Sequence, residues 1–178
     1  MSSKTNAIDQ QLNRIQLLLL DVDGVLTDGS IVYNDDGIET KAFHVKDGLG
    51  LRLLMSAGIE VGIVTGRRSG ALHNRCLDLK IKKKYIFDNV KDKAAILDTI
   101  AAKTNISEKD MAFIGDDLPD IPLMKRIGLP IAVADAHAAV IGHAAIITKA
   151  KGGKGAVREI CEKILKARGL WQGILEKF

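Results

Sequence analysis

The residues best suited to chemistry in this sequence are two aspartates, Asp21 and Asp23, which directly follow an apolar run. That run, residues 17–20, consists of four leucines and has the length of a buried parallel strand. Side chains two apart on a strand point the same way, so both carboxylates would emerge together where the strand ends. Crowded carboxylates repel each other unless a cation or a shared proton relieves them. A hard cation bound through oxygen atoms, such as Mg²⁺, fits that requirement.

Polar residues also follow two later apolar runs. Residues 59–64 end at Thr65, and residues 111–114 lead into a Gly-Asp-Asp sequence. The carboxyl ends of parallel strands share one edge of a sheet, which is where open α/β sheets bind their ligands. We therefore expect one site at this edge, built from Asp21, Asp23, Thr65, Lys93, Asp116 and Asp117.

Each of these residues also has a simpler structural explanation. The acidic loop after residues 17–20 could be an ordinary turn, because Asp and Gly are common turn residues. Thr65, or the pair Asp116 and Asp117, could cap the helix that follows. Lys93 could be a solvated surface lysine. The arrival of all these groups at one sheet edge is what favours a functional site.

The elements that must position these groups alternate along the chain. We expect strands at residues 17–20, 59–64, 85–87, 111–114, 131–133 and 145–147. We expect helices near residues 47–57, 68–79, 92–102, 118–127 and 137–143, and from residue 155 to about 167. Parallel neighbours need crossover connections, so this order predicts an α/β fold with a doubly wound parallel sheet.

Three segments lie outside this alternation. Residues 30–45 are typical of two short strands around a turn, either a flap above the site or an ordinary surface hairpin. Residues 1–13 are expected to be a mobile or loosely packed lead-in, and residues 169–178 a tail. No repeat or linker is visible, so residues 1–178 are predicted to form a single domain.

Composition narrows the functional classes. A chain of 178 residues suits one domain, and its 47% hydrophobic and 27% charged residues are typical of a soluble globular protein. The net charge of +4 favours a small anion over nucleic acid, because basic residues are scattered and aromatic residues make up only 4%. Cys76 and Cys161 lack metal-ligand spacing and indicate a reducing, cytoplasmic location. We expect no signal peptide and no membrane span.

The chain resembles the haloacid dehalogenase (HAD) superfamily of phosphohydrolases over residues 17–159. The motifs that carry the resemblance are Asp21-Val-Asp23-Gly24, Thr65-Gly66, Lys93, and Gly115-Asp116-Asp117 with Asp120. Residues 23–29, 41–48, 65–67, 115–120, 132–136 and 152–159 are similar to the minimal-cap branch that contains 3-deoxy-D-manno-octulosonate 8-phosphate phosphatases. The resemblance implies a Rossmann-like HAD sheet with a β-hairpin flap and no large cap domain.

The resemblance implies a catalytic role for four residues. Asp21 would be the nucleophile that forms an aspartyl-phosphate. Asp23 would protonate the departing sugar oxygen and then take a proton from the attacking water. Thr65 and Lys93 would stabilise the transferring phosphoryl oxygens.

It also implies a Mg²⁺ site. Asp21, the backbone carbonyl of Asp23, and Asp116 would hold the ion. Asp117 and Asp120 would be supporting residues that orient the ligands or the waters around the ion.

Substrate recognition is implied for a further set of residues. Arg67 follows the Thr-Gly pair, where the branch's octulosonate phosphatases carry Arg and its nonulosonate phosphatases carry Glu. Arg75 matches a position that a neighbouring subunit supplies in the relatives, although an exposed helix arginine is an equally simple interpretation. Asp47 and Gly48 would offer backbone N–H groups to the ligand. Lys154 and Arg158 resemble an anion-facing segment, although a plain loop before a helix would look similar.

These expectations converge on Mg²⁺-dependent hydrolysis of 3-deoxy-D-manno-octulosonate 8-phosphate, for lipopolysaccharide sugar biosynthesis. The family implies a homotetramer in which neighbours complete each site. The rival within enzymes is a phosphatase for N-acylneuraminate 9-phosphate or 2-keto-3-deoxynononate 9-phosphate. A receiver-type phosphorylation module would instead carry its acceptor after the third strand, where Asp88 is the only carboxylate, and would leave Asp116 and Asp117 without a purpose.

Overall fold

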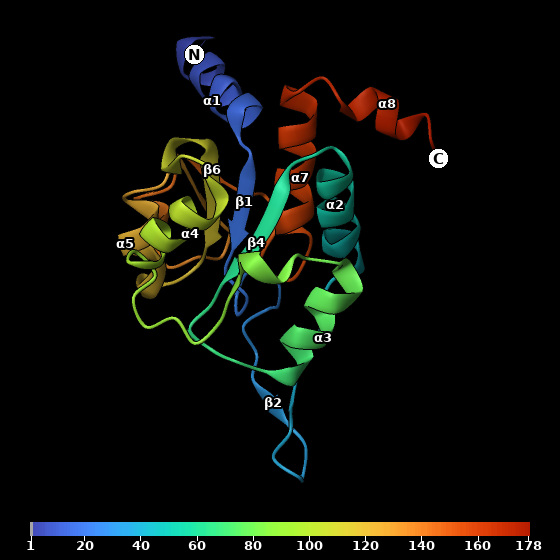
Figure 1. Ribbon diagram of the computed structural model, residues 1–178, viewed down its shortest axis with the longest axis vertical. Helices are drawn as coiled ribbons and strands as arrows, with labels where there is room; N and C mark the ends of the chain where they lie inside the picture. The colour runs from blue at the N-terminus through green and yellow to red at the C-terminus, as the bar shows by residue number, and fades with distance from the viewer. Residues whose placement is uncertain (1) are drawn as a thin grey trace.

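A parallel sheet runs through the middle of the protein, and a hairpin projects from one end of it (Figure 1). The computed structural model describes residues 2–178, with side chains from residue 7 onward. The strands are β1 (Leu17–Leu20), β4 (Glu60–Val64), β5 (Ile86–Phe87), β6 (Met111–Gly115), β7 (Leu129–Ala132) and β8 (Ile146–Ile147). They pair in parallel in the order β5-β4-β1-β6-β7-β8. The predicted doubly wound α/β sheet is therefore confirmed.

Strand order creates a binding crevice beside β1. From β1 the chain adds β4 and β5 on one side, then returns to place β6, β7 and β8 on the other. Neighbouring loops diverge where the winding reverses, which leaves a crevice at the carboxyl ends of β1 and β6. All residues of β1 and β6 are buried, as expected for central strands covered on both faces.

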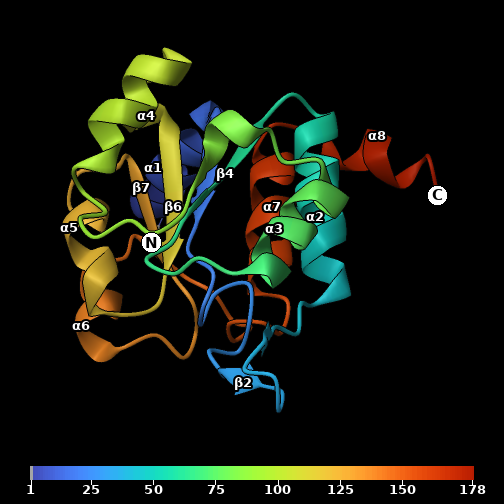
Figure 2. The ribbon, with the colours of Figure 1, turned by 60° about the horizontal axis from the view of Figure 1, so that its bottom comes forward.

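Helices cover both faces of the sheet (Figure 2). One face carries α2 (Val45–Ser56), α3 (Gly70–Leu79) and α7 (Ala156–Ala167). The other carries α4 (Ile96–Thr104), α5 (Ile121–Met124) and α6 (Ala138–Ile141). Short 3₁₀ turns, η1 (Lys83–Tyr85), η2 (Glu108–Asp110) and η3 (Leu118–Asp120), precede β5, β6 and α5. No helix within residues 2–178 combines the length and apolar character that a membrane crossing needs.

Both ends of the chain differ from the prediction. Residues 1–13 were expected to be a mobile or loosely packed lead-in, but α1 (Ser2–Arg14) is a helix whose Leu12 is buried; Met1 lies outside the described residues. The tail expected at residues 169–178 contains α8 (Trp171–Leu175), whose Ile174 is also buried. Such short or polar helices gain most of their stability from tertiary packing, which local sequence does not reveal.

The helix expected near residues 92–102 begins later, at Ile96. The carboxylate of Asp92 accepts hydrogen bonds from the N–H groups of Ala94 and Ala95, which forms a turn before the helix. Lys93 therefore lies in this turn and not on the helix. An Asx-type turn of this kind competes with the helical backbone at its start.

The hairpin expected at residues 30–45 is confirmed, and its role as a flap stays a prediction. Strands β2 (Val32–Tyr33) and β3 (Glu39–Thr40) pair antiparallel, and α2 begins directly after the hairpin, at Val45. The side-chain oxygen of Asn34 accepts hydrogen bonds from the N–H groups of Asp36 and Ile38 and closes the turn. The hairpin stands clear of the main body, at the carboxyl end of the sheet (Figure 1).

Candidate active site

The ends of three adjacent strands bring the predicted residues together. Strand β1 pairs with β4 on one side and with β6 on the other, and Leu20 lies opposite Ile63 and Ile114. The loops that follow these strands therefore enter one crevice. A cavity of about 360 Å³ occupies it, lined by Asp21, Asp23, Gly29, Thr65, Gly66, Arg67, Val90, Lys91, Lys93, Asp116, Asp117, Pro119 and Asp120.

The structure tests the simpler explanations, capping and solvent exposure, for three of these residues. Thr65 is buried and does not cap α3, because Ser69 accepts the capping hydrogen bond from the N–H of Leu72. Lys93 is not a solvated lysine, since its side chain is 5% exposed. Asp117 is exposed, and its Oδ1 accepts a hydrogen bond from the N–H of Leu118 at 2.8 Å. Capping therefore accounts for Asp117 but not for Thr65, and solvent exposure does not account for Lys93.

A buried ion-pair network surrounds Asp21. The Nζ of Lys93 lies 3.0 Å from Asp21 Oδ1 and 2.6 Å from Asp120 Oδ1. The other oxygen of Asp120 accepts hydrogen bonds from the N–H groups of Asp116, at 2.9 Å, and Asp117, at 3.3 Å. A Cβ at Gly115 would lie 2.5 Å from the same oxygen, so only glycine leaves room for this contact. Asp120 thus fixes both Lys93 and the loop that carries Asp116.

The electrostatics of the site favour an added positive charge. Burial raises the pKa of Asp21 to about 6, although Lys93 opposes the rise. Burial, together with the charges of Asp21 and Asp120, raises the pKa of Asp116 to about 8. Burial acts to lower the pKa of Lys93, but the two carboxylates beside it outweigh this effect and raise it. One lysine is therefore too little charge for the carboxylates gathered here.

These residues fit a hard divalent cation. Carboxylate oxygens of Asp21, Asp116 and Asp120 lie within 4.8 Å of one another. The Oδ1 of Asp116 is buried and lacks a hydrogen-bond partner among the described residues, so this oxygen is available to bind a cation. A Cβ at Gly24 would lie 2.0 Å from Asp116 Oδ2, so this glycine keeps the space open. An all-oxygen set of this kind suits Mg²⁺.

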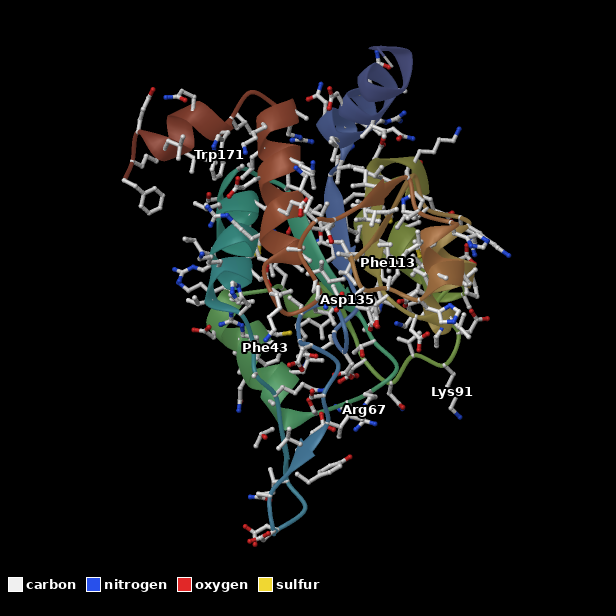
Figure 3. All side chains as sticks on the ribbon, turned by 180° about the vertical axis from the view of Figure 1, so that it is seen from behind. Phe43, Arg67, Lys91, Phe113, Asp135 and Trp171 are labelled. Carbon is white, nitrogen blue, oxygen red and sulfur yellow. The ribbon has the colours of Figure 1, made fainter. Side chains whose placement is uncertain are left out.

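The second aspartate is held by two cations. Asp23 forms an ion pair with Lys41 through Oδ1, and its Oδ2 lies 3.7 Å from Nε of Arg67. Glu39 joins the two cations, because it lies 2.8 Å from Lys41 Nζ and 2.5 Å from a terminal nitrogen of Arg67. Arg67 also donates to the hydroxyl of Tyr33 at 3.2 Å, and it lies at the base of the flap (Figure 3). Sequence reasoning missed Glu39 and Lys41, although their two-residue spacing beside a strand placed them on one face.

Two predicted substrate residues lie outside the cavity of this chain. Arg75 forms an ion pair with Asp78 at 2.8 Å and stacks on the ring of Phe43 at 5.6 Å. Gly48 was expected to offer its N–H to a ligand, but that N–H donates to the carbonyl of His44 at 3.3 Å. A Cβ at Gly48 would lie 2.2 Å from an Arg75 nitrogen, so a side chain at this position would displace the Arg75 guanidinium.

The Asp47 carboxylate has a structural role that was not part of the prediction, which concerned the backbone N–H of this residue. Its carboxylate is buried and accepts hydrogen bonds from the N–H groups of Gly155, at 3.3 Å, and Arg158, at 2.7 Å. It therefore caps the start of α7 and ties that helix to α2. The Arg158 side chain stacks on Trp171, which lies at the end of the molecule far from the flap (Figure 3). Lys154 is largely exposed and does not line the cavity.

The glycine-rich segment before α7 packs directly on the Asp21 loop. The N–H of Gly152 donates to Asp135 Oδ1 at 2.9 Å, and that of Gly153 donates to the carbonyl of Val25 at 2.9 Å. A Cβ at Gly152 would lie 1.7 Å from the carbonyl oxygen of Gly24. These glycines therefore support the loop that carries the two aspartates.

Comparisons with known proteins agree with this geometry. Residues 85–160 match the model of the haloacid dehalogenase-like hydrolase family. The chain is 43% identical over 155 residues to the 3-deoxy-D-manno-octulosonate 8-phosphate phosphatase of Escherichia coli K12, covering 87% of this chain and 81% of that protein. It is 42% identical over 164 residues to the Yersinia pestis phosphatase of the same name, covering 92% and 87%.

Solved structures of such phosphatases have the same fold. A crystal structure from Moraxella catarrhalis, in complex with magnesium, phosphate and KDO, superposes with a TM-score of 0.94 at 41% identity, covering 97% of this chain and 98% of that chain. The cobalt-bound form from Haemophilus influenzae superposes with a TM-score of 0.88 at 38% identity, covering 93% and 99%. Both coverages are near complete, so the likeness extends over the whole fold.

Proposed function

This chain belongs to the haloacid dehalogenase-like hydrolases, in the branch of the 3-deoxy-D-manno-octulosonate 8-phosphate phosphatases, and from that premise we propose that it hydrolyses 3-deoxy-D-manno-octulosonate 8-phosphate to the free sugar acid and phosphate. The observation that carries the proposal is the meeting of Asp21, Asp23, Thr65, Lys93 and Asp116 in one cavity at the carboxyl end of the sheet. By this membership, the chain is a phosphoric monoester hydrolase.

The reaction divides into two displacements at phosphorus. In the first, an Asp21 oxygen bonds to phosphorus as the bond from phosphorus to the sugar oxygen breaks, and Asp23 gives that oxygen its proton. In the second, water bonds to phosphorus and loses a proton to Asp23, and the bond between phosphorus and Asp21 breaks. The position of Asp21 at the end of β1 beside Lys93 supports its role in the first bond, and the position of Asp23 in the same cavity supports its role in proton transfer.

Charge repulsion is the main obstacle, because a carboxylate must approach a phosphoryl dianion. Lys93 places a buried ammonium 3.0 Å from Asp21, and the Thr65 hydroxyl lies at the next strand end, so both would stabilise the transferring oxygens. Mg²⁺ would be held by Asp21, the backbone carbonyl of Asp23, and Asp116, and when bound it supplies the neutralising charge that the carboxylates require. Asp120 would orient Asp116 through its backbone hydrogen bond.

Arg67 supports the choice of an eight-carbon acid. Its side chain lines the cavity, and a guanidinium binds a carboxylate through two parallel hydrogen bonds. Within the branch, arginine at this position goes with octulosonate phosphatases. By this proposal, the product is a sugar for lipopolysaccharide. A higher kcat/KM for the nine-carbon 9-phosphates than for the eight-carbon 8-phosphate would overturn this choice.

We also propose a homotetramer in which neighbouring subunits complete each site. The flap exposes large apolar side chains in this chain: Ile31, Val32, Tyr33 and Ile38. Such a patch needs a covering partner in water. Arg75, Lys154 and Arg158 do not line the cavity of their own chain, and in this proposal Arg75 contributes to the site of a neighbour. A fully active monomer in analytical ultracentrifugation would contradict this arrangement.

The experiment that tests the reaction is phosphate release from a panel of phosphorylated sugar acids with Mg²⁺, using Asp21→Asn as the blank. We expect strong turnover of the eight-carbon 8-phosphate, lost in the variant. Weak turnover of every compound in the panel would support a phosphatase activity but would contradict the proposed substrate. Activity that survives in Asp21→Asn would remove the nucleophile assigned here.

A further inference from the structure

The flap contributes a buried cation, Lys41, that takes no part in the two displacements at phosphorus. Lys41 follows β3, and its side chain is only 2% exposed, although lysine side chains are normally solvated. Burying an ammonium is costly unless it is paired. Its partners are Asp23, with which it forms an ion pair, and Glu39, at 2.8 Å. One end of this pairing is therefore the residue that transfers the proton.

The contact determines how the Asp23 carboxylate is oriented. The terminal torsion of an aspartate is soft, so a carboxylate at a cavity wall rotates unless its oxygens are held. Here Lys41 holds Oδ1, and Nε of Arg67 lies 3.7 Å from Oδ2. The two cations approach different oxygens, so together they select one rotation of the carboxylate.

Glu39, a residue of the flap, links the two cations that hold the Asp23 carboxylate. It lies between the cations, 2.8 Å from Lys41 Nζ and 2.5 Å from Arg67, so two positive and two negative groups alternate. Such a closed network restrains each member more than one isolated pair does. Glu39 belongs to β3, and Lys41 follows it closely, so the hairpin holds both groups over Asp23.

We infer that Lys41 is a positioning residue that holds the Asp23 carboxylate in the orientation from which its proton reaches the leaving sugar oxygen. The inference rests on the proposed phosphatase activity. In the step concerned, the bond between phosphorus and the sugar oxygen breaks, the phosphoryl group passes to Asp21, and the proton of Asp23 passes to the sugar oxygen. Lys41 takes no part in these bonds and acts only through Asp23.

The test compares two leaving groups in the variant Lys41→Met. An alkyl oxygen, as in 3-deoxy-D-manno-octulosonate 8-phosphate, needs the proton, whereas p-nitrophenolate departs without one. The measured quantity is kcat/KM, which reports phosphoryl transfer to Asp21 and excludes the later hydrolysis common to both substrates. We expect the ratio of the alkyl to the aryl kcat/KM to fall about 10- to 100-fold, within the range of general acid catalysis. Lys41→Arg, which keeps the cation, should restore most of the ratio.

The ratio also separates positioning from folding. A smaller folded fraction lowers both kcat/KM values equally and leaves their ratio unchanged. Lys46→Met, at an exposed lysine in the first turn of α2, is the matched control and should keep the wild-type ratio. Equal losses on both substrates in Lys41→Met would overturn the inference and leave the proposed function intact. A wild-type protein that releases phosphate from neither substrate would overturn the proposed function itself.

Discussion

The ammonium group of Lys93 lies 3.0 Å from the Oδ1 of Asp21, inside the protein and away from bulk water. The same ammonium lies 2.6 Å from Asp120, so a single lysine balances the charges of both Asp21 and Asp120. The pairing is possible because Lys93 lies in the turn before α4 and not on the helix. Its position in this turn brings it to the carboxyl end of β1.

Lys93→Met should disable the reaction and weaken the fold. We expect kcat to fall by about 100-fold or more, as when one preorganised group that stabilises transition-state charge is removed. The variant also leaves Asp120 buried without its cation, which costs about 3–5 kcal/mol of the free energy of unfolding. Phosphate release and urea denaturation measure the two effects. Lys125→Met, at an exposed lysine outside the cavity, is the control and should match the wild type in both.

Removal of divalent metal should make stability depend on pH in an unusual direction. The pKa values of Asp21, about 6, and Asp116, about 8, exceed the ordinary 3.8, so the folded metal-free protein binds protons more tightly than the unfolded chain. These two groups therefore make their full contribution to the free energy of unfolding below about pH 4, and they lose it as the pH rises toward 8. We expect the melting temperature of EDTA-treated protein to decrease across this window, beyond the trend of other groups.

Mg²⁺ should reverse that loss by binding the ionised carboxylates. We expect the rise in melting temperature on adding Mg²⁺ to be larger at pH 8 than at pH 5. Below pH 8, we expect Mg²⁺ binding to release protons from the Asp21 and Asp116 carboxyl groups. Thermal denaturation and calorimetry in two buffers of different ionisation enthalpy measure these effects. Asp116→Asn is the matched variant and should flatten the pH dependence of the metal-free protein. A Mg²⁺ effect that is equal at both pH values would contradict the electrostatics assigned to Asp21 and Asp116.

Gly152→Ala should damage catalysis through the backbone of the Asp21 loop. The added Cβ would lie 1.7 Å from the carbonyl oxygen of Gly24, and backbone cannot move aside as a flexible side chain does. We expect a fall in kcat/KM of about 100-fold, since a displacement near 1 Å is enough for such a loss. Gly173→Ala is the control, because no atom lies within 4 Å of its Cβ position. Wild-type activity in Gly152→Ala would show that the glycine-rich segment before α7 does not determine the position of the Asp21 loop.

Asp47→Ala should separate a structural role from a substrate contact. The buried carboxylate accepts hydrogen bonds from Gly155 and Arg158, so we expect a loss of about 1–2 kcal/mol in the free energy of unfolding, as for other lost helix caps. KM for the sugar-acid phosphate should stay close to the wild-type value. The control is Asp35→Ala, at an exposed turn of the flap. A raised KM with unchanged stability would show instead that the Asp47 carboxylate contacts the substrate.

The local pattern of the sequence was sufficient for the sheet and for the residues at its edge. An unbroken leucine run, followed by aspartates two apart and a glycine, is typical of a buried parallel strand with a polar end. Helices between the apolar runs force parallel pairing, and parallel pairing brings Asp21, Thr65 and Asp116 to one edge. These conclusions depend only on short-range periodicity and on the chirality of crossovers.

Tertiary packing decided the features that join distant segments. Glu39, Lys41 and Arg67 surround Asp23 only because the base of the flap lies against the loop after β1, and nothing in their own neighbourhoods specifies that approach. Asp47 caps a helix far along the chain because α2 and α7 pack together. Periodicity indicates which face of an element is buried, but it does not specify which buried face another element covers. The sequence therefore determined that Asp21 lies at the edge of the sheet, and only the tertiary structure determined the network of charges around Asp23.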